Sequence, residues 1–146
     1  MKKTLKIDTY DPVIYPRLFW VTDELEGLDR VFEFITIYSG GEKTTDFEEL
    51  MKYINDNPYG MVTCAVMRKS DSRLGVIVIV LDIDEITPDM IPHEAVHVAD
   101  YFCNQLDIVT TDFKDGNEHY AYLAGWAGGC ISKTVSNRQK NKEYDN

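Results

Sequence analysis

The segment His93-Glu94-Ala95-Val96-His97 constrains this chain more than any other part of its sequence. On a helix, two histidines four positions apart project from one face about a turn from each other, close enough to share a metal ion. Glu94 is rotated by ~100° from His93, so its side chain flanks the metal without binding it and can take a proton from a water molecule. This is the pattern of zinc-dependent peptidases. It predicts a helix with His93 and His97 as Zn²⁺ ligands and Glu94 as general base; the alternative is a surface helix whose two histidines bind no metal.

A catalytic zinc ion needs a third protein ligand, which this segment does not supply. Side chains later in the sequence that can provide it are Asp100, Asp107, Asp112, Asp115, Glu118 and His119. Glu118 is the preferred candidate, because it opens the last predicted helix. Ala121, Gly125 and Gly128 are predicted on its own face of that helix, and small residues there let two helices approach closely. The alternative is that Glu118 only complements the helix dipole at an N-terminus.

Other polar residues near the motif are candidates for supporting roles. Asp100 follows His97 by three residues on the same helix face, where it can accept the free N–H of a ligating histidine. It is also the second candidate for third ligand, although three ligands from one straight helix encircle a metal poorly. His119, Tyr120 and Tyr122 are candidate donors to a substrate oxyanion; the alternatives are a surface histidine and two tyrosines that pack in a core.

The chain is predicted to fold as strands first and helices last, an α+β arrangement. Residues 4–8 and 14–22 read as strands, and residues 25–37 suit a helix or a strand. Residues 47–55, 91–106 and about 117–136 have helical spacing, and residues 61–68 and 74–83 read as a β-hairpin.

The second hairpin strand is apolar on both faces over Gly75–Ile83, which predicts a central position in the sheet. A substrate peptide that pairs with a strand then needs another partner, for which Met61–Arg68 is the candidate.

Length and composition limit the possible roles. The 146 residues fit one domain, predicted as residues 1–135 with a polar, frayed tail at 136–146. A formal net charge of −10 argues against nucleic acids and anionic membranes as partners. Three widely spaced cysteines in apolar contexts predict buried free thiols in a reducing compartment. Lys2 and Lys3 precede alternating residues and not a continuous apolar run, so no secretory signal peptide is expected.

Several segments resemble small phage and prophage proteins that carry a zinc peptidase motif. They are residues 14–21, 75–78, 93–100 and 118–126, so the resemblance extends over most of residues 5–130. The arrangement is similar to the gluzincin group of peptidases, in which a glutamate on a following helix, often after an asparagine, is the third zinc ligand. The resemblance implies a minimal zincin-like fold, with Glu118 after Asn117 in that role. It departs from larger gluzincins at Tyr122, where some carry an aspartate that orients a ligating histidine, so Asp100 is the substitute.

The sequence therefore predicts a zinc-dependent metallopeptidase that hydrolyses peptide bonds in a peptide or protein substrate. The alternative is a catalytically silent zincin-like structural or interaction protein, for example a phage virion component. The intact Glu94 favours the enzyme, whereas the small size and the missing substrate-binding lobe favour the alternative. The resemblance implies a virion or host protein as partner, and a location in the bacterial host cytoplasm or in a virion.

Overall fold

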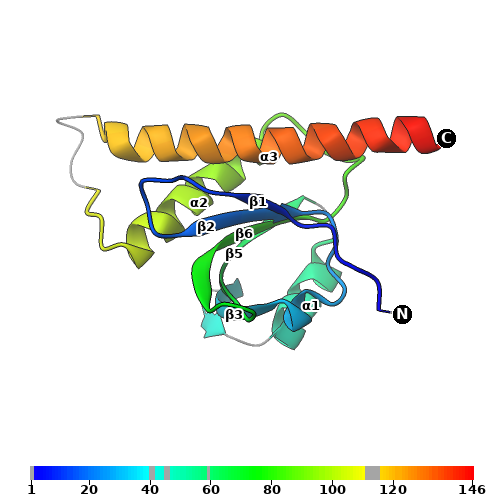
Figure 1. Cartoon of the computed structure of the whole chain (residues 1–146), viewed down its shortest axis with the longest axis horizontal. Coiled ribbons are helices and arrows are strands. Elements are labelled where there is room, and N and C mark those ends of the chain that lie inside the picture. The colour runs from blue at the N-terminus through cyan, green and yellow to red at the C-terminus, as the bar shows by residue number, and fades with distance from the viewer. Residues whose placement is uncertain (1, 40–41, 45–46, 59, 111–115) are drawn as a thin grey trace.

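A mixed β-sheet with helices on both faces forms the body of the molecule in the computed structural model (Figure 1). The structure describes residues 2–39, 42–44, 47–58, 60–110 and 116–146. The sheet strands follow the order β1-β2-β6-β5-β3-β4. Their bounds are β1 Asp8–Tyr10, β2 Leu18–Thr22, β3 Phe32–Ser39, β4 Glu42–Thr44, β5 Met61–Arg68 and β6 Arg73–Val80. The helices are η1 Leu28–Arg30, α1 Phe47–Asp56, α2 Met90–Gln105 and α3 Glu118–Asp145. The predicted α+β class is confirmed.

Strands β5 and β6 form the predicted antiparallel hairpin, in register from Met61 opposite Val80 to Arg68 opposite Arg73. On its other side β6 runs parallel to β2, so the prediction that this strand is central is confirmed. Every side chain from Val76 to Val80 is buried, as expected of a strand covered on both faces. A Cβ atom at Gly75 would lie 1.9 Å from the Leu18 carbonyl oxygen, so β6 can pass β2 there only as glycine.

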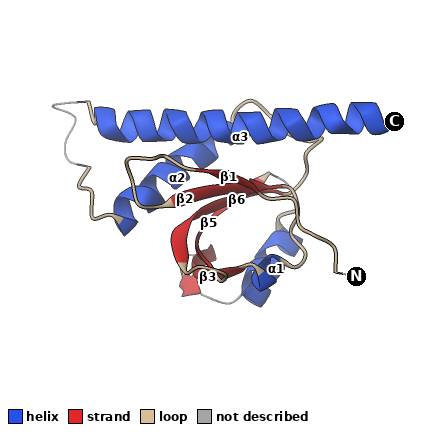
Figure 2. Ribbon diagram, viewed as in Figure 1, coloured by secondary structure: helices blue, strands red, loops and turns tan. Residues whose placement is uncertain are grey.

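Two hydrophobic clusters fill the two sides of the sheet, because successive strand residues point to opposite faces. Helices α2 and α3 cover one face and α1 covers the other (Figure 2). Phe19 and Phe102 belong to the first cluster, and Trp126 packs its ring against both of them. Trp20 and Leu50 belong to the second cluster. Trp20 is thus buried, and Trp126 is partly buried against the first cluster.

Three N-terminal segments differ from the prediction. Of residues 4–8 only Asp8 lies in a strand, β1. Of residues 14–22 only Leu18–Thr22 form a strand, and β2 is internal to the sheet, between β1 and β6. Residues 25–37 hold the short helix η1 and the first part of β3. The β-branched and aromatic residues of this segment suit a strand, and pairing with β5 selects that state.

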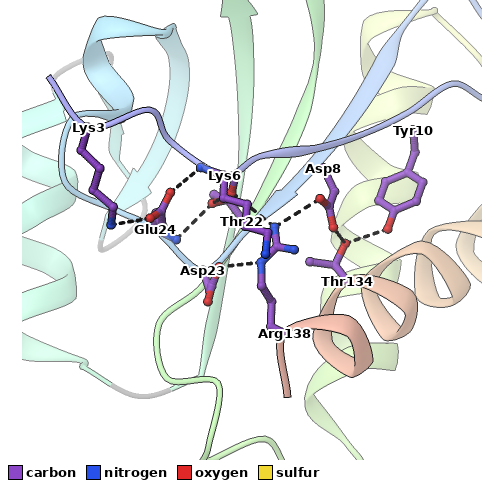
Figure 3. Close-up of polar contacts among 9 residues, drawn as sticks. All are labelled: Lys3, Lys6, Asp8, Tyr10, Thr22, Asp23, Glu24, Thr134 and Arg138. Carbon is purple, nitrogen blue, oxygen red and sulfur yellow. Dashed lines mark hydrogen bonds and ion pairs between the residues drawn. The ribbon is translucent and has the colours of Figure 1, made fainter. Parts of the chain in front are cut away.

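The prediction of a frayed tail at residues 136–146 is wrong. Helix α3 continues to Asp145, and Arg138 is buried in this part of it. The guanidinium forms ion pairs with Asp8 at 3.2 Å and Asp23 at 3.0 Å (Figure 3). Further along, the Gln139 side-chain amide donates to the Ile83 carbonyl, and Lys142 pairs with Asp84. Polar contacts with β1 and with the residues that follow β2 and β6 therefore hold the first part of residues 136–146, which lack apolar periodicity.

The cysteines are free and buried, as predicted. Burial raises the pKa of the Cys64 thiol to about 12 and that of Cys130 to about 11, so both thiols are protonated at neutral pH. Among the helices of the described residues, none combines the length and the apolar character needed to cross a membrane.

Candidate metal centre

The two histidines of the motif lie side by side on the exposed face of α2. Their Nε2 atoms are 3.2 Å apart, and the ring centroids are 4.8 Å apart with the planes at 75°. Two nitrogen atoms bound at about 2.0–2.1 Å to one tetrahedral zinc ion lie ~3.3–3.4 Å from each other. The pair therefore fits two ligands of one zinc ion. Without a metal, the same separation suits a hydrogen bond between one protonated and one unprotonated ring nitrogen.

Glu94 lies on the side of α2 that packs on the sheet, and its side chain is buried. Its Oε2 atom accepts a hydrogen bond from the Thr63 hydroxyl of β5. Its Oε1 atom is 3.9 Å from His93 Nε2. The carboxylate thus spans the space between the sheet and the histidine pair, with one oxygen toward each.

Burial raises the pKa of Glu94 above its ordinary value, and the Thr63 hydroxyl and the two histidines offset part of this rise. A carboxylate with a raised pKa is a stronger base than one in water, which suits a group that must accept a proton. Thr63 is absent from the sequence prediction. The signal that could have indicated it is a polar residue in the otherwise apolar run Met61–Met67.

Glu118 occupies the first turn of α3, where it is exposed. Asn117 precedes it in the left-handed conformation, with φ of 47°. Within residues 2–39, 42–44, 47–58, 60–110 and 116–146, no three His, Cys, Asp or Glu side chains are grouped closely enough to hold a metal ion. The structure therefore brings His93 and His97 together without Glu118 beside them. The assignment of Glu118 as third ligand stays a prediction, and the candidates Asp112 and Asp115 lie outside the described residues.

Asp100 and Tyr120 form a pair that links the two helices. The Tyr120 hydroxyl donates to Asp100 Oδ1 at 2.7 Å and also lies 3.2 Å from the Val96 carbonyl oxygen. Burial and the bond to the Asp100 carboxylate raise the pKa of Tyr120, so the phenol keeps its proton. Tyr120 thus donates its hydroxyl proton to Asp100, the residue that was predicted to accept the N–H of a ligating histidine. His119 is exposed and Tyr122 is 76% exposed.

The small residues of α3 face α2 only in part. A Cβ atom on Gly128 would lie 3.6 Å from the Ala95 Cβ, so the two helices meet at this glycine. Gly125 has no neighbour within 4 Å of the same position, and both Gly125 and Ala121 are exposed. The predicted contact face is therefore right for Gly128 and wrong for the other two, because the buried stripe of α3 lies further round the helix.

Strand β5 is paired on both sides over only half of its length. β6 pairs with all of it, whereas the described pairs with β3 run from Ala65 to Arg68, with an irregularity in the register between Phe34 and Thr36. In the described register, Met61–Cys64 thus has a strand neighbour on one side only. Thr63, the partner of Glu94, lies in this half, so an incompletely paired stretch of backbone runs beside the candidate base.

Comparisons of this chain with protein-family models, with curated protein sequences and with solved structures find no match.

Proposed function

We propose that this chain is a zinc-dependent metallopeptidase of minimal, zincin-like form. The observation that supports it is the 3.2 Å separation of the His93 and His97 Nε2 atoms, with the Glu94 carboxylate 3.9 Å from the first of them. A metal site that serves stability alone has no need of a buried carboxylate beside its ligands. General-base chemistry does need one.

In this proposal His93 and His97 hold the zinc ion, and Glu118 is the third protein ligand. Zinc, when bound, supplies a Lewis acid that polarises a carbonyl group and lowers the pKa of a water molecule. Glu94 takes the proton of the attacking water on Oε1, the oxygen that faces the histidines, and transfers it to the leaving amine. The water oxygen forms the new bond to the carbonyl carbon, and the carbon–nitrogen bond of the peptide breaks.

The substrate in this proposal is an extended peptide. Residues Met61–Cys64 have no described pair with β3, and in this proposal a peptide pairs with them as an added strand. Thr63 lies in this stretch and contacts Glu94, so a peptide paired there passes close to the base. Main-chain pairing of this kind supplies affinity without demanding particular side chains.

One observation favours the alternative of a catalytically silent, zincin-like structural or interaction protein. Among the described residues, the exposed His93–His97 pair does not belong to a group of three side chains that could hold a metal ion. A pair with only two protein ligands binds zinc weakly and does not fix an open catalytic position. In that case Glu94 is a relic of an ancestral enzyme.

The test combines a metal measurement with a cleavage measurement. The purified chain and Glu94→Gln are analysed for bound zinc, and both are incubated with a mixed peptide library. We expect zinc in both proteins and cleavage by the unmodified chain alone. Zinc in both proteins with no cleavage by either supports the silent protein. A chain that binds no zinc contradicts the assignment of His93 and His97.

A further inference from the structure

Thr63, which lies outside the His93–His97 motif, forms a hydrogen bond with Glu94. A carboxylate is an acceptor only, so the hydrogen bond between Thr63 Oγ1 and Glu94 Oε2 has the hydroxyl as its donor. This bond fixes which oxygen of Glu94 faces the sheet. The other oxygen, Oε1, then faces His93. A carboxylate bound through one oxygen cannot exchange its two oxygens by rotation without breaking that bond.

The hydroxyl is carried by a strand that pairs with β6 along its whole length. Thr63 lies opposite Val78 of the central strand β6, and the ladder continues on both sides of this pair. Threonine branches at Cβ, which restricts the rotation of its side chain about χ1. Sites carried by strands hold their groups more precisely than sites carried by loops. The direction of the donor is thus set by the sheet and not by the helix that carries Glu94.

We infer that Thr63 is a positioning residue for Glu94: its hydroxyl holds the carboxylate so that Oε1 points at the space beside the histidine pair. The inference rests on the proposed peptidase function. It assigns part of the site to β5, 31 residues before Glu94. Removal of the hydroxyl leaves the metal ligands in place and lets the carboxylate turn, so the chemical step slows while binding of metal and peptide is retained.

The experiment compares Thr63→Val, which removes the hydroxyl and keeps the shape, with Thr63→Ser, which keeps the hydroxyl. The probe is the peptide that the unmodified chain cleaves best in the mixed library. We expect Thr63→Val to lower kcat by ~10- to 100-fold, with KM changed by less than about 2-fold. We expect Thr63→Ser to retain kcat within about 3-fold, and both variants to bind as much zinc as the unmodified chain. An unchanged kcat in Thr63→Val overturns the inference, and so does a loss in Thr63→Ser as large as that in Thr63→Val.

A matched control is available elsewhere in the fold. The Thr134 hydroxyl donates to Asp8 Oδ2 at 2.8 Å, also a bond from a threonine to a carboxylate (Figure 3). Thr134→Val therefore makes the same chemical change away from the motif. We expect it to lower stability and leave kcat unchanged. A fall in kcat equal to that of Thr63→Val shows that a general loss of order explains both, and overturns the inference.

A second readout does not depend on activity. In the zinc-free protein, Thr63→Val is expected to lower the folding equilibrium constant about 10-fold, because Glu94 stays buried without its donor. In a Glu94→Ala background the same substitution is expected to have no such cost. If Thr63→Val lowers the folding equilibrium constant equally in the unmodified chain and in Glu94→Ala, the Thr63–Glu94 hydrogen bond does not contribute to stability and the inference is overturned. A zinc-loaded chain that cleaves no peptide overturns the peptidase and the inference together, whereas an active chain with an indifferent Thr63→Val overturns the inference alone.

Discussion

Glu94 has two requirements that oppose each other. As a base it must be close to the histidine pair and shielded from water, yet a buried carboxylate destabilises the fold that buries it. The Thr63 hydroxyl donates to it, and its pKa stays above the ordinary value because burial is the largest effect. The site therefore costs stability in the absence of metal, as functional sites commonly do.

From this cost follows a prediction for the zinc-free protein. A group whose pKa is raised by folding stabilises the folded state below its unfolded pKa, and this contribution is lost as the pH rises through the folded pKa. Glu94→Gln is neutral at every pH and can still accept the Thr63 hydroxyl. We expect it to be more stable than the unmodified chain at pH 7, by ~1 kcal/mol, with the difference disappearing below about pH 4. Urea unfolding in chelator between pH 4 and 8 measures this, with the exposed Glu143→Gln as the control that shows no such gain. A loss of stability in Glu94→Gln at pH 7 contradicts the prediction.

The ligand assignments give a second prediction at the same scale. The side chains of His93 and His97 are exposed on α2, so His93→Ala should leave the fold intact, within about 0.5 kcal/mol. We expect it to weaken zinc binding by ~100-fold or more. Glu118→Gln should weaken binding as well, whereas His119→Gln, the neighbouring exposed residue, should not. Zinc titration monitored by calorimetry compares the variants.

Two results contradict the assignments. Zinc binding that survives His93→Ala removes the histidine pair from the site. Zinc binding that is equal in Glu118→Gln and His119→Gln removes Glu118 as third ligand and moves that role to another acid or to water. In both cases the measured unfolding free energy shows whether the variant is folded.

At the scale of the elements, Gly128 is a point of close contact between α3 and α2. Gly128 lies against Ala95, whereas Gly125, one turn earlier, faces open space. We expect Gly128→Leu to lower the unfolding free energy by about 1–3 kcal/mol, because its side chain must displace packed atoms. Gly125→Leu should instead raise it by ~0.5–1 kcal/mol, since leucine favours a helix more than glycine does. Thermal or urea unfolding of the two variants tests the helix contact, and equal effects would show that α3 does not meet α2 at Gly128.

The elements that could be predicted from the sequence are those with one strong pattern. Helix α2 and the β5–β6 hairpin follow from periodicity, and their observed bounds lie close to the expected ones. Residues 25–37 suit a helix or a strand, and pairing with β5 selects the strand for the residues from Phe32 onward. The motif residues could likewise be named in advance, because their spacing is local. The contact of Thr63 with Glu94 depends on the packing of β5 on α2, and the sequence shows only a polar residue in an otherwise apolar strand.

At the scale of the whole molecule, α3 ties the C-terminal part of the chain to its first strand. Arg138 forms ion pairs with Asp8 of β1 and with Asp23 just after β2. It also lies 3.3 Å from the Lys6 carbonyl oxygen (Figure 3). These partners are more than 110 residues away in the sequence. The polar C-terminal segment is therefore predicted as a tail when its partners are unknown, although Arg138 within it is buried and paired.

Arg138 gives the final prediction, because a nearby residue provides a contrast. The Arg138 side chain is 7% exposed, whereas Lys142 and its partner Asp84 are 52% and 66% exposed. Arg138→Ala leaves two acids facing each other without their cation, and we expect it to lower the unfolding free energy by about 2–4 kcal/mol. Arg138→Lys should recover only part of this, because an ammonium group cannot bind both acids in the fork geometry of a guanidinium. Lys142→Ala removes a pair that water and salt already screen, so we expect it to lower the unfolding free energy by at most about 0.5 kcal/mol.

Urea unfolding of the three variants measures these differences in unfolding free energy. Equal losses in Arg138→Ala and Lys142→Ala would mean that the last turns of α3 contribute as a frayed surface helix does, and that the fold is complete without them.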